Sequence, residues 1–302
     1  MNIAVVIPVF NESKIINIIL SNPGFTKYTV IVVDDCSTIP VALTRTDYPL
    51  YLITHSKNLG QGAALQTGMD FCKSIGVNIL VHFDGDGQHQ VADIPKLVQP
   101  LLNKEADMVI GSRFLNKTQP GNSSTIPYGK LIILKLARII QFIFTGIVLT
   151  DSQNGLRALN ENALKRINIK QNRMAHAIEL IKCAVQKNLV IKEIPVDILY
   201  TSYSLGKGQK TYNGLLICIR LLLERFRLIL AGLSIIVIAA YIAQVKMFVS
   251  LGEFYYTLAS VMLLSVLIVW YNRREKLNQE KTSAIREFAL KNVQEINNRI
   301  IV

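Results

Sequence analysis

Cysteine is scarce in this sequence, with four residues in a chain of 302, and tryptophan occurs only once. The cysteines are scattered, and none has the paired spacing of a zinc site or a redox dithiol; they are Cys36, Cys72, Cys183 and Cys218. We therefore expect free thiols in a reducing compartment, without a disulfide framework.

Acidic residues are also few, with 21 Asp and Glu against 33 Lys and Arg, which gives a net charge of +12. A basic chain suits a polyanionic partner, but the sequence has no nucleic-acid motif and no basic patch interleaved with aromatic residues. We expect no nucleic-acid partner. Attraction to the anionic headgroups of a membrane accounts better for the charge.

Long uncharged hydrophobic runs are confined to the C-terminal third, at 228–245 and 254–271. Each is about 18 residues long, the length at which a transmembrane helix becomes the default interpretation; a buried core helix is the alternative for either run alone. Basic residues flank the pair on its outer sides, whereas the loop between the runs has only Lys246. The positive-inside rule then predicts a multi-pass protein of the cytoplasmic membrane, with both termini and the N-terminal region cytoplasmic. The first residues enter a strand pattern directly, so we expect no signal peptide.

Short β-branched runs alternate with helical segments over the first 200 residues. We expect strands at 3–10, 29–33, 51–53, 79–83, 106–110 and 190–200, a further strand after the polar turn that begins at 150, and a helix at 63–72. This alternation predicts βαβ units and a mainly parallel sheet. Pro195 places the last strand near an edge of the sheet.

Polar residues follow four of these strands. They are the segments 8–12, 34–35, 84–86 and 112–113. Because ligands of open α/β sheets bind beyond the carboxyl ends of the strands, we expect these residues to form one site.

Asp84 and Asp86 follow the fourth strand, and each is followed by a glycine. Two carboxylates at the mouth of a buried strand are costly unless a cation meets them. Together with Gln88 they offer oxygen ligands that suit Mg²⁺ or Mn²⁺, and the glycines leave room for a phosphate. The alternative is a polar turn that caps the strand.

For the remaining segments the sequence gives either two alternative interpretations or one local expectation. The basic and apolar segment 128–142 is either an interfacial helix or a core helix with snorkelling lysines. The loop 203–210 is either an anion-binding loop or a connector. Asn11 or Ser13 is the expected cap of the first helix, and His176 and Glu179 are expected to form a surface pair. Apolar residues of 278–302 fall near helical spacing, which predicts an amphipathic helix.

In this order, the motifs resemble those of family 2 glycosyltransferases with the GT-A fold, and most closely the polyprenyl-phosphate glycosyltransferases related to dolichol-phosphate mannose synthase. The matching segments are 6–12, 32–35, 58–62, 84–88, 110–113, 151–157 and 203–210. The resemblance implies a Rossmann-like GT-A domain at 1–212. After it we expect an interfacial helix at 213–227, a transmembrane hairpin formed by 228–245 and 254–271, and a cytoplasmic helical tail at 272–302.

The resemblance also implies roles for individual residues. A nucleotide-sugar donor would be held by Pro8, Phe10, Glu12, Asp34, Asp35, Gly60, Asp84, Gly85 and Asp86. Mg²⁺ or Mn²⁺ would be held by Asp84, Asp86 and Gln88, and the phosphate of a polyprenyl acceptor by Arg113, Lys130, Ser204 and Lys207. The catalytic residues would be Asp84, Asp86 and Arg113. The sequence departs from the family pattern at Gln61, Gly85 and Asn154.

The implied reaction is an inverting transfer of a sugar to polyprenyl phosphate, whose anionic oxygen needs no general base. One alternative is a transferase that extends a lipid-linked glycan or a cell-surface polysaccharide. Processive enzymes of that kind carry a Gln-x-x-Arg-Trp motif, whereas the one tryptophan here is Trp270 in the second hydrophobic run. The non-enzyme alternative is a membrane scaffold with an inactive domain, which Asp84, Asp86 and Arg113 argue against. The hairpin and tail helices are candidates for self-association into a homo-oligomer.

Overall fold

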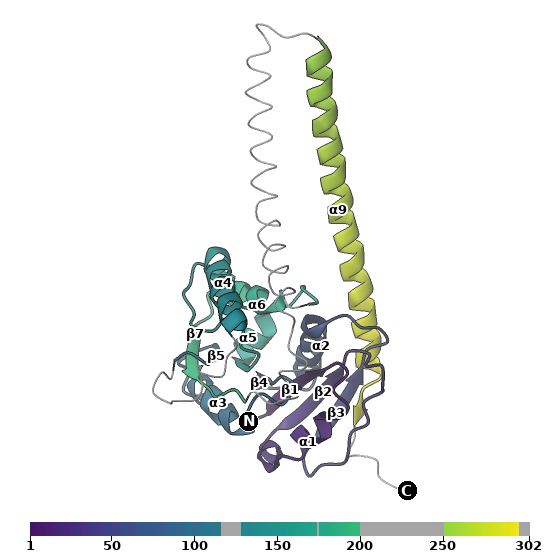
Figure 1. Ribbon diagram of the computed structural model, residues 1–302. Helices are drawn as coiled ribbons and strands as arrows, with labels where there is room; N and C mark the ends of the chain where they lie inside the picture. The colour runs from purple at the N-terminus through teal and green to yellow at the C-terminus, as the bar shows by residue number, and fades with distance from the viewer. Residues whose placement is uncertain (116–127, 174, 200–250, 296–302) are drawn as a thin grey trace. The chain divides into compact units, whose positions relative to one another are not determined.

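The computed structural model describes residues 1–115, 128–173, 175–199 and 251–295. They contain an eight-stranded sheet with the strand order β7-β5-β6-β4-β1-β2-β3-β8 (Figure 1). Its strands are β1 (Ile3–Val9), β2 (Thr29–Asp34), β3 (Leu50–Thr54), β4 (Ile79–His82), β5 (Met108–Ser112), β6 (Arg157–Asn160), β7 (Ile191–Pro195) and β8 (Gln294–Glu295). Only β6 and β8 run antiparallel to their neighbours. The prediction of a mainly parallel sheet is confirmed.

The central strands are buried on both faces, which explains their continuous β-branched sequences. Along β1, Val5, Ile7 and Val9 join one hydrophobic cluster, whereas Ala4 and Val6 join another on the opposite face. This alternation is the period of two that a strand imposes on its side chains.

Helices cover both faces of the sheet (Figure 1). The first cluster takes side chains from α1 (Ile16–Leu20), the 3₁₀ turns Pro23–Lys27 and Val91–Asp93, and α3 (Ile94–Leu102). The second takes side chains from α2 (Gln61–Ser74), α5 (Glu161–Arg166) and α6 (His176–Gln186). The sheet therefore lies between two helical layers, with its strand ends left to carry a site.

Most differences from the predicted elements are at their ends. The helix expected at 63–72 is α2, which extends to Gln61 and Ser74, and the strand expected to reach 200 ends at Pro195 in β7. Because β7 is an edge strand, the predicted position of Pro195 is confirmed. The predicted cap of α1 is wrong: Asn11 has a φ of 58°, and its side-chain oxygen instead accepts a hydrogen bond from the Thr38 amide.

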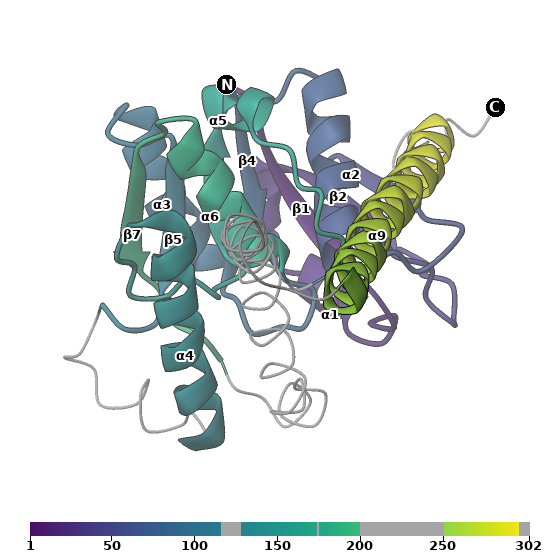
Figure 2. The same cartoon turned by 90° about the horizontal axis from the view of Figure 1, so that it is seen from above.

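The segment expected as an interfacial or a core helix forms α4 (Tyr128–Thr145), which packs on α6 (Figure 2). Leu134, Ala137 and Ile140 are buried, as the core interpretation requires. Ile139, Phe142 and Ile143 are exposed along another side of the same helix. The core interpretation is confirmed for one side of α4, whereas the interfacial interpretation of the exposed side stays a prediction.

The C-terminal part of the chain contains α9 (Leu251–Lys291), which includes the second hydrophobic run, and then β8. The run at 228–245 lies outside the described residues, as does the whole of the expected interfacial segment 213–227. In the parts of the chain that are described, no helix is both long and apolar enough to cross a membrane. The helix expected over 278–302 ends at Lys291, because the chain then pairs as β8 with β3.

Candidate active site

The carboxyl ends of β1, β2, β4 and β5 lie at one edge of the sheet, because these strands are parallel. The polar residues predicted to gather there follow these strands. They form three features: a cluster of acids around the end of β4 (Asp84, Asp86 and Glu12, called the carboxylate group below), a turn fixed by Asp35 after β2, and an ion pair of Arg113 after β5.

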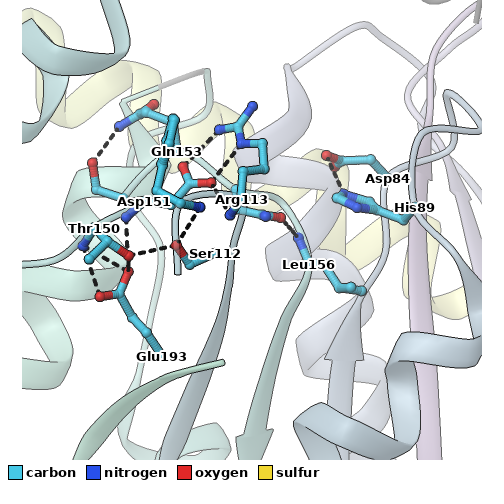
Figure 3. Close-up of polar contacts among 12 residues, drawn as sticks. Asp84, His89, Ser112, Arg113, Thr150, Asp151, Gln153, Leu156 and Glu193 are labelled. Atoms are coloured by element: carbon cyan, nitrogen blue, oxygen red, sulfur yellow. Dashed lines mark hydrogen bonds and ion pairs between the residues drawn. The ribbon is translucent and has the colours of Figure 1, made fainter. Parts of the chain in front are cut away.

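Asp84 is the most enclosed acid of the carboxylate group. Its carboxylate accepts a hydrogen bond from Gln61 Nε2 at 2.8 Å. It also lies 3.2 Å from His89 Nε2 (Figure 3). Burial alone raises the pKa of this carboxyl, but the hydrogen bond and charge of His89, with smaller contributions from His176 and Arg157, outweigh burial, so its pKa lies below the ordinary value. Asp84 is therefore held as a carboxylate.

Asp86 has the opposite electrostatic surroundings. Burial raises the pKa of its carboxyl, and the neighbouring charges of Asp84 and Glu12 raise it further. Its oxygens accept hydrogen bonds from the backbone amide and the side-chain amide of Gln88, at 3.0 and 2.8 Å. Two half-buried carboxylates thus lie in one short turn, and the charge of Glu12 also acts on Asp86. A divalent cation relieves such a concentration of negative charge.

The predicted metal ligands Asp84, Asp86 and Gln88 are thus held in one short turn. No group of three or more His, Cys, Asp or Glu side chains suited to a metal occurs among the residues that the structure describes. The predicted set is of a different kind, since it joins two carboxylates to an amide. Its oxygen chemistry and its surplus of negative charge fit Mg²⁺ or Mn²⁺.

The residues predicted to bind the donor lie at two places, beside the end of β1 and after the end of β2. Gly85 packs against β1, where a Cβ in its place would lie 3.0 Å from the Pro8 carbonyl oxygen. Phe10 is exposed just beyond the end of β1. Asp34 accepts hydrogen bonds from the amide and hydroxyl of Ser37.

Asp35 anchors the glycine-rich turn that precedes α2. It accepts hydrogen bonds from the amides of Leu59 and Gly60 at 2.9 and 2.6 Å, and it pairs with His55 Nδ1 at 2.8 Å. Gly60 has a φ of +111°, and a Cβ there would lie 2.4 Å from the Asn172 carbonyl oxygen, so only glycine fits. Asp35 thereby fixes the turn from which Gln61 reaches Asp84.

Arg113 follows β5 and is held by Asp151 (Figure 3). Its Nε and Nη2 donate to the two oxygens of Asp151 at 2.6 and 2.7 Å, and its backbone amide also donates to Asp151. Glu193 in turn accepts hydrogen bonds from the amides of Thr150 and Asp151. The guanidinium is thus placed by a carboxylate network, which the sequence motif did not predict.

The other predicted acceptor residues are not placed beside Arg113. Lys130 belongs to α4, and only its backbone position is described. Ser204 and Lys207 lie outside the described residues, as does the loop 203–210. Their predicted role in binding phosphate stays a prediction.

Three buried residues near Asp84 were missed or misjudged from the sequence. His82 and Arg157 are opposite each other in the β4–β6 pair, and both are buried. His176 is buried as well, so its predicted place in a surface pair is wrong; Glu179 instead accepts hydrogen bonds from the amides of Lys170 and Gln171. The alternation of β6 offers the one signal in the sequence, since it places Arg157 on the same face of the sheet as the apolar residue Leu159.

The sequence is similar to those of known transferases that act on lipid phosphates. The chain is 32% identical over 241 residues to UDP-N-acetylglucosamine--dolichyl-phosphate N-acetylglucosaminyltransferase of Methanococcus voltae, covering 73% of this chain and 95% of that protein. It is 25% identical over 214 residues to polyprenol monophosphomannose synthase of Mycolicibacterium smegmatis, covering 67% and 78%.

A solved structure gives the corresponding result for the fold. Glucosyl-3-phosphoglycerate synthase from Mycobacterium tuberculosis, in complex with phosphoglyceric acid, superposes with a TM-score of 0.51 at 19% identity, covering 73% of this chain and 79% of that one. The expected GT-A-like mixed α/β sheet is thereby confirmed. Since the sequence model of glycosyl transferase family 2 matches residues 4–167, more than half of the chain, this protein belongs to that family and is a glycosyltransferase.

Proposed function

We propose that this glycosyltransferase moves a sugar from a nucleotide-sugar donor to a polyprenyl phosphate, with inversion at the anomeric carbon and with Mg²⁺ or Mn²⁺ bound. The observation that carries the proposal is the pairing of two groups at one sheet edge. An acidic group of Asp84, Asp86 and Glu12 follows the strands at its centre, and an arginine held by a carboxylate network follows β5. The names of the two relatives above support the choice of acceptor.

In this proposal the acidic residues bind the cation and the basic residue binds the acceptor phosphate. Asp84 and Asp86, with Gln88, would hold the cation, which neutralises the charge that develops on the departing nucleoside diphosphate. Arg113 would meet the acceptor phosphate, because its guanidinium is already fixed in orientation by Asp151. An anionic phosphate oxygen then attacks the anomeric carbon, the bond from that carbon to the donor's diphosphate breaks, and the diphosphate leaves with the bonding electrons. No proton has to be removed from the nucleophile, so no general base is required.

A membrane location supports access to such a lipid. The two hydrophobic runs and their basic flanks favour a hairpin with the catalytic domain on the cytoplasmic side. On the catalytic domain, Ile139, Phe142 and Ile143 of α4 form an exposed apolar face, with Lys135 and Arg138 nearby in the helix. Such a face suits the boundary between acyl chains and anionic headgroups.

The decisive experiment is to incubate membranes that contain the protein with a panel of labelled nucleotide sugars and then to extract the lipids. We expect one labelled sugar to appear in a polyprenyl-phosphate lipid, and EDTA to abolish its formation. Labelling of a longer glycan without a sugar–phosphate lipid would favour an extending transferase. No product with any common nucleotide sugar would contradict the proposal.

A further inference from the structure

One turn of the chain contacts both halves of the proposed site. Its first residue, Asp151, holds Arg113 through three hydrogen bonds. Near its other end, Gly155 packs against the Asp84 carboxylate so closely that a Cβ there would lie 1.9 Å from an Asp84 oxygen. The turn 151–157 is therefore a physical link between the proposed metal ligand and the proposed phosphate-binding arginine.

Arg157 closes this turn. It is 2% exposed, and its Nη2 donates to the Ser152 carbonyl oxygen at 3.0 Å, which joins the end of the turn to its beginning. Its charge is attracted to both Asp84 and Asp151. One buried cation thus acts on the two carboxylates that serve the two halves of the site.

The negative charges that act on Arg157 are those of Asp84 and Asp151. His82 lies opposite it in the sheet, and His176 is also close enough to interact with its charge. A buried guanidinium is costly without compensating negative charge, and Asp84 and Asp151 supply it.

We propose that Arg157 is a positioning residue, which fixes the placement of the Asp84 carboxylate relative to the Asp151–Arg113 ion pair. This inference rests on the proposed function, because it assigns Asp84 to the metal and Arg113 to the acceptor. It goes beyond that function by making the two halves of the site depend on one residue that touches neither substrate.

The test compares Arg157→Met, Arg157→Lys and Arg166→Met in the full chain. Arg166 is the matched control, because it also donates to a backbone carbonyl, that of Lys187, but is exposed. Mn²⁺ affinity is measured by electron paramagnetic resonance in the presence of UDP or GDP, and sugar transfer is measured in parallel. We expect Arg157→Met to weaken Mn²⁺ binding roughly tenfold, the effect usual for groups that orient metal ligands. Arg157→Lys should recover part of the affinity, and Arg166→Met should match wild type.

A double-mutant cycle with Asp151→Asn tests the link between the two halves. If Arg157 positions both, the loss of kcat in the double variant will be smaller than the product of the two single losses. Arg157→Lys supplies the same cycle if Arg157→Met does not fold, as judged by circular dichroism. Folded variants with wild-type Mn²⁺ affinity and independent effects on kcat would overturn the inference. Wild-type protein that binds Mn²⁺ but transfers no sugar would contradict the proposed function instead, and the Mn²⁺ measurements would still decide the role of Arg157.

Discussion

At the scale of single residues, Asp86 illustrates how the proposed site opposes stability. Burial and the charges of Asp84 and Glu12 disfavour its ionised form. Asp86→Asn keeps the shape but removes the charge, so we expect the metal-free protein to gain about 1 kcal/mol in unfolding free energy, as active-site substitutions often do. Mn²⁺ binding and sugar transfer should be lost. Thermal melting with EDTA, together with Mn²⁺ titration, checks both expectations; a less stable variant that still binds Mn²⁺ would contradict them.

His82 predicts how stability depends on pH. It is 1% exposed, and neither ring nitrogen has a hydrogen-bond partner within the part of the chain that the structure describes. Its pKa falls from 6.5 to about 3, mainly through burial. Below pH 6.5 the unfolded chain binds a proton that the folded chain does not, so this residue makes stability fall as the pH falls toward 3. Its share of the slope is about 1.4 kcal/mol per pH unit within that range.

The variant His82→Leu isolates this effect. At pH 7.5 we expect it to be at least as stable as wild type, because it removes two buried polar atoms that no described residue pairs with. Between pH 6 and pH 4.5 its melting temperature should fall less steeply than that of wild type. Identical pH profiles for the two proteins would show that His82 does not contribute to acid sensitivity.

Sequence alone could place Asp84, Asp86, Asp35 and Arg113 at strand ends, because the strand pattern is local. It could not supply their partners, since the contacts join distant positions: Asp35 with His55, and Arg113 with Asp151. The apparent surface pair at His176 was misjudged for the same reason, because its burial depends on packing against the other elements. The amino-acid sequence of a helix does not reveal which other parts of the chain pack against it and bury its residues.

At the scale of elements, the C-terminal segment completes the catalytic sheet. β8 pairs with β3, Arg286 forms an ion pair with Asp70 of α2, and Ala289 is buried in the second hydrophobic cluster. The amphipathic pattern predicted a helix there, but it could not show that Ala289 and Leu290 join the second hydrophobic cluster, which also takes side chains from α2 and β3. The segment covers a strand edge that is otherwise open to pairing with other chains.

Removal of residues 284–302 should therefore destabilise the catalytic domain and promote its aggregation. A milder change is Arg286→Asp, which places two acids together and should cost about 2 kcal/mol. The combination with Asp70→Arg should restore most of the loss, because it reverses the pair. Light scattering of the truncated protein checks the first expectation, and melting temperatures of Arg286→Asp and of the double variant check the second. Equal stability of the single and double variants would contradict a role for the ion pair.

At the scale of the whole molecule, the exposed apolar residues of α4 bear on how the domain could reach a lipid acceptor. One side of α4 is packed on α6, so its exposed residues Ile139, Phe142 and Ile143 can change without disturbing the core. The double variant Phe142→Glu and Ile143→Glu places acidic groups on the side that we expect to meet anionic headgroups. We therefore expect roughly tenfold lower kcat/KM with a long-chain polyprenyl phosphate in vesicles, because both apolar burial and electrostatic attraction are lost.

The same variant should retain its activity toward a short, water-soluble polyprenyl phosphate, because the two substitutions leave Asp84, Asp86 and the Arg113–Asp151 pair in place. The conservative pair Phe142→Leu and Ile143→Val serves as the control, with wild-type rates on both acceptors. Equal losses on the long and the short acceptor would mean that the substitutions damage the fold. Unchanged rates on vesicles would mean that this face does not meet the bilayer, so that the acceptor reaches Arg113 by another side of the domain.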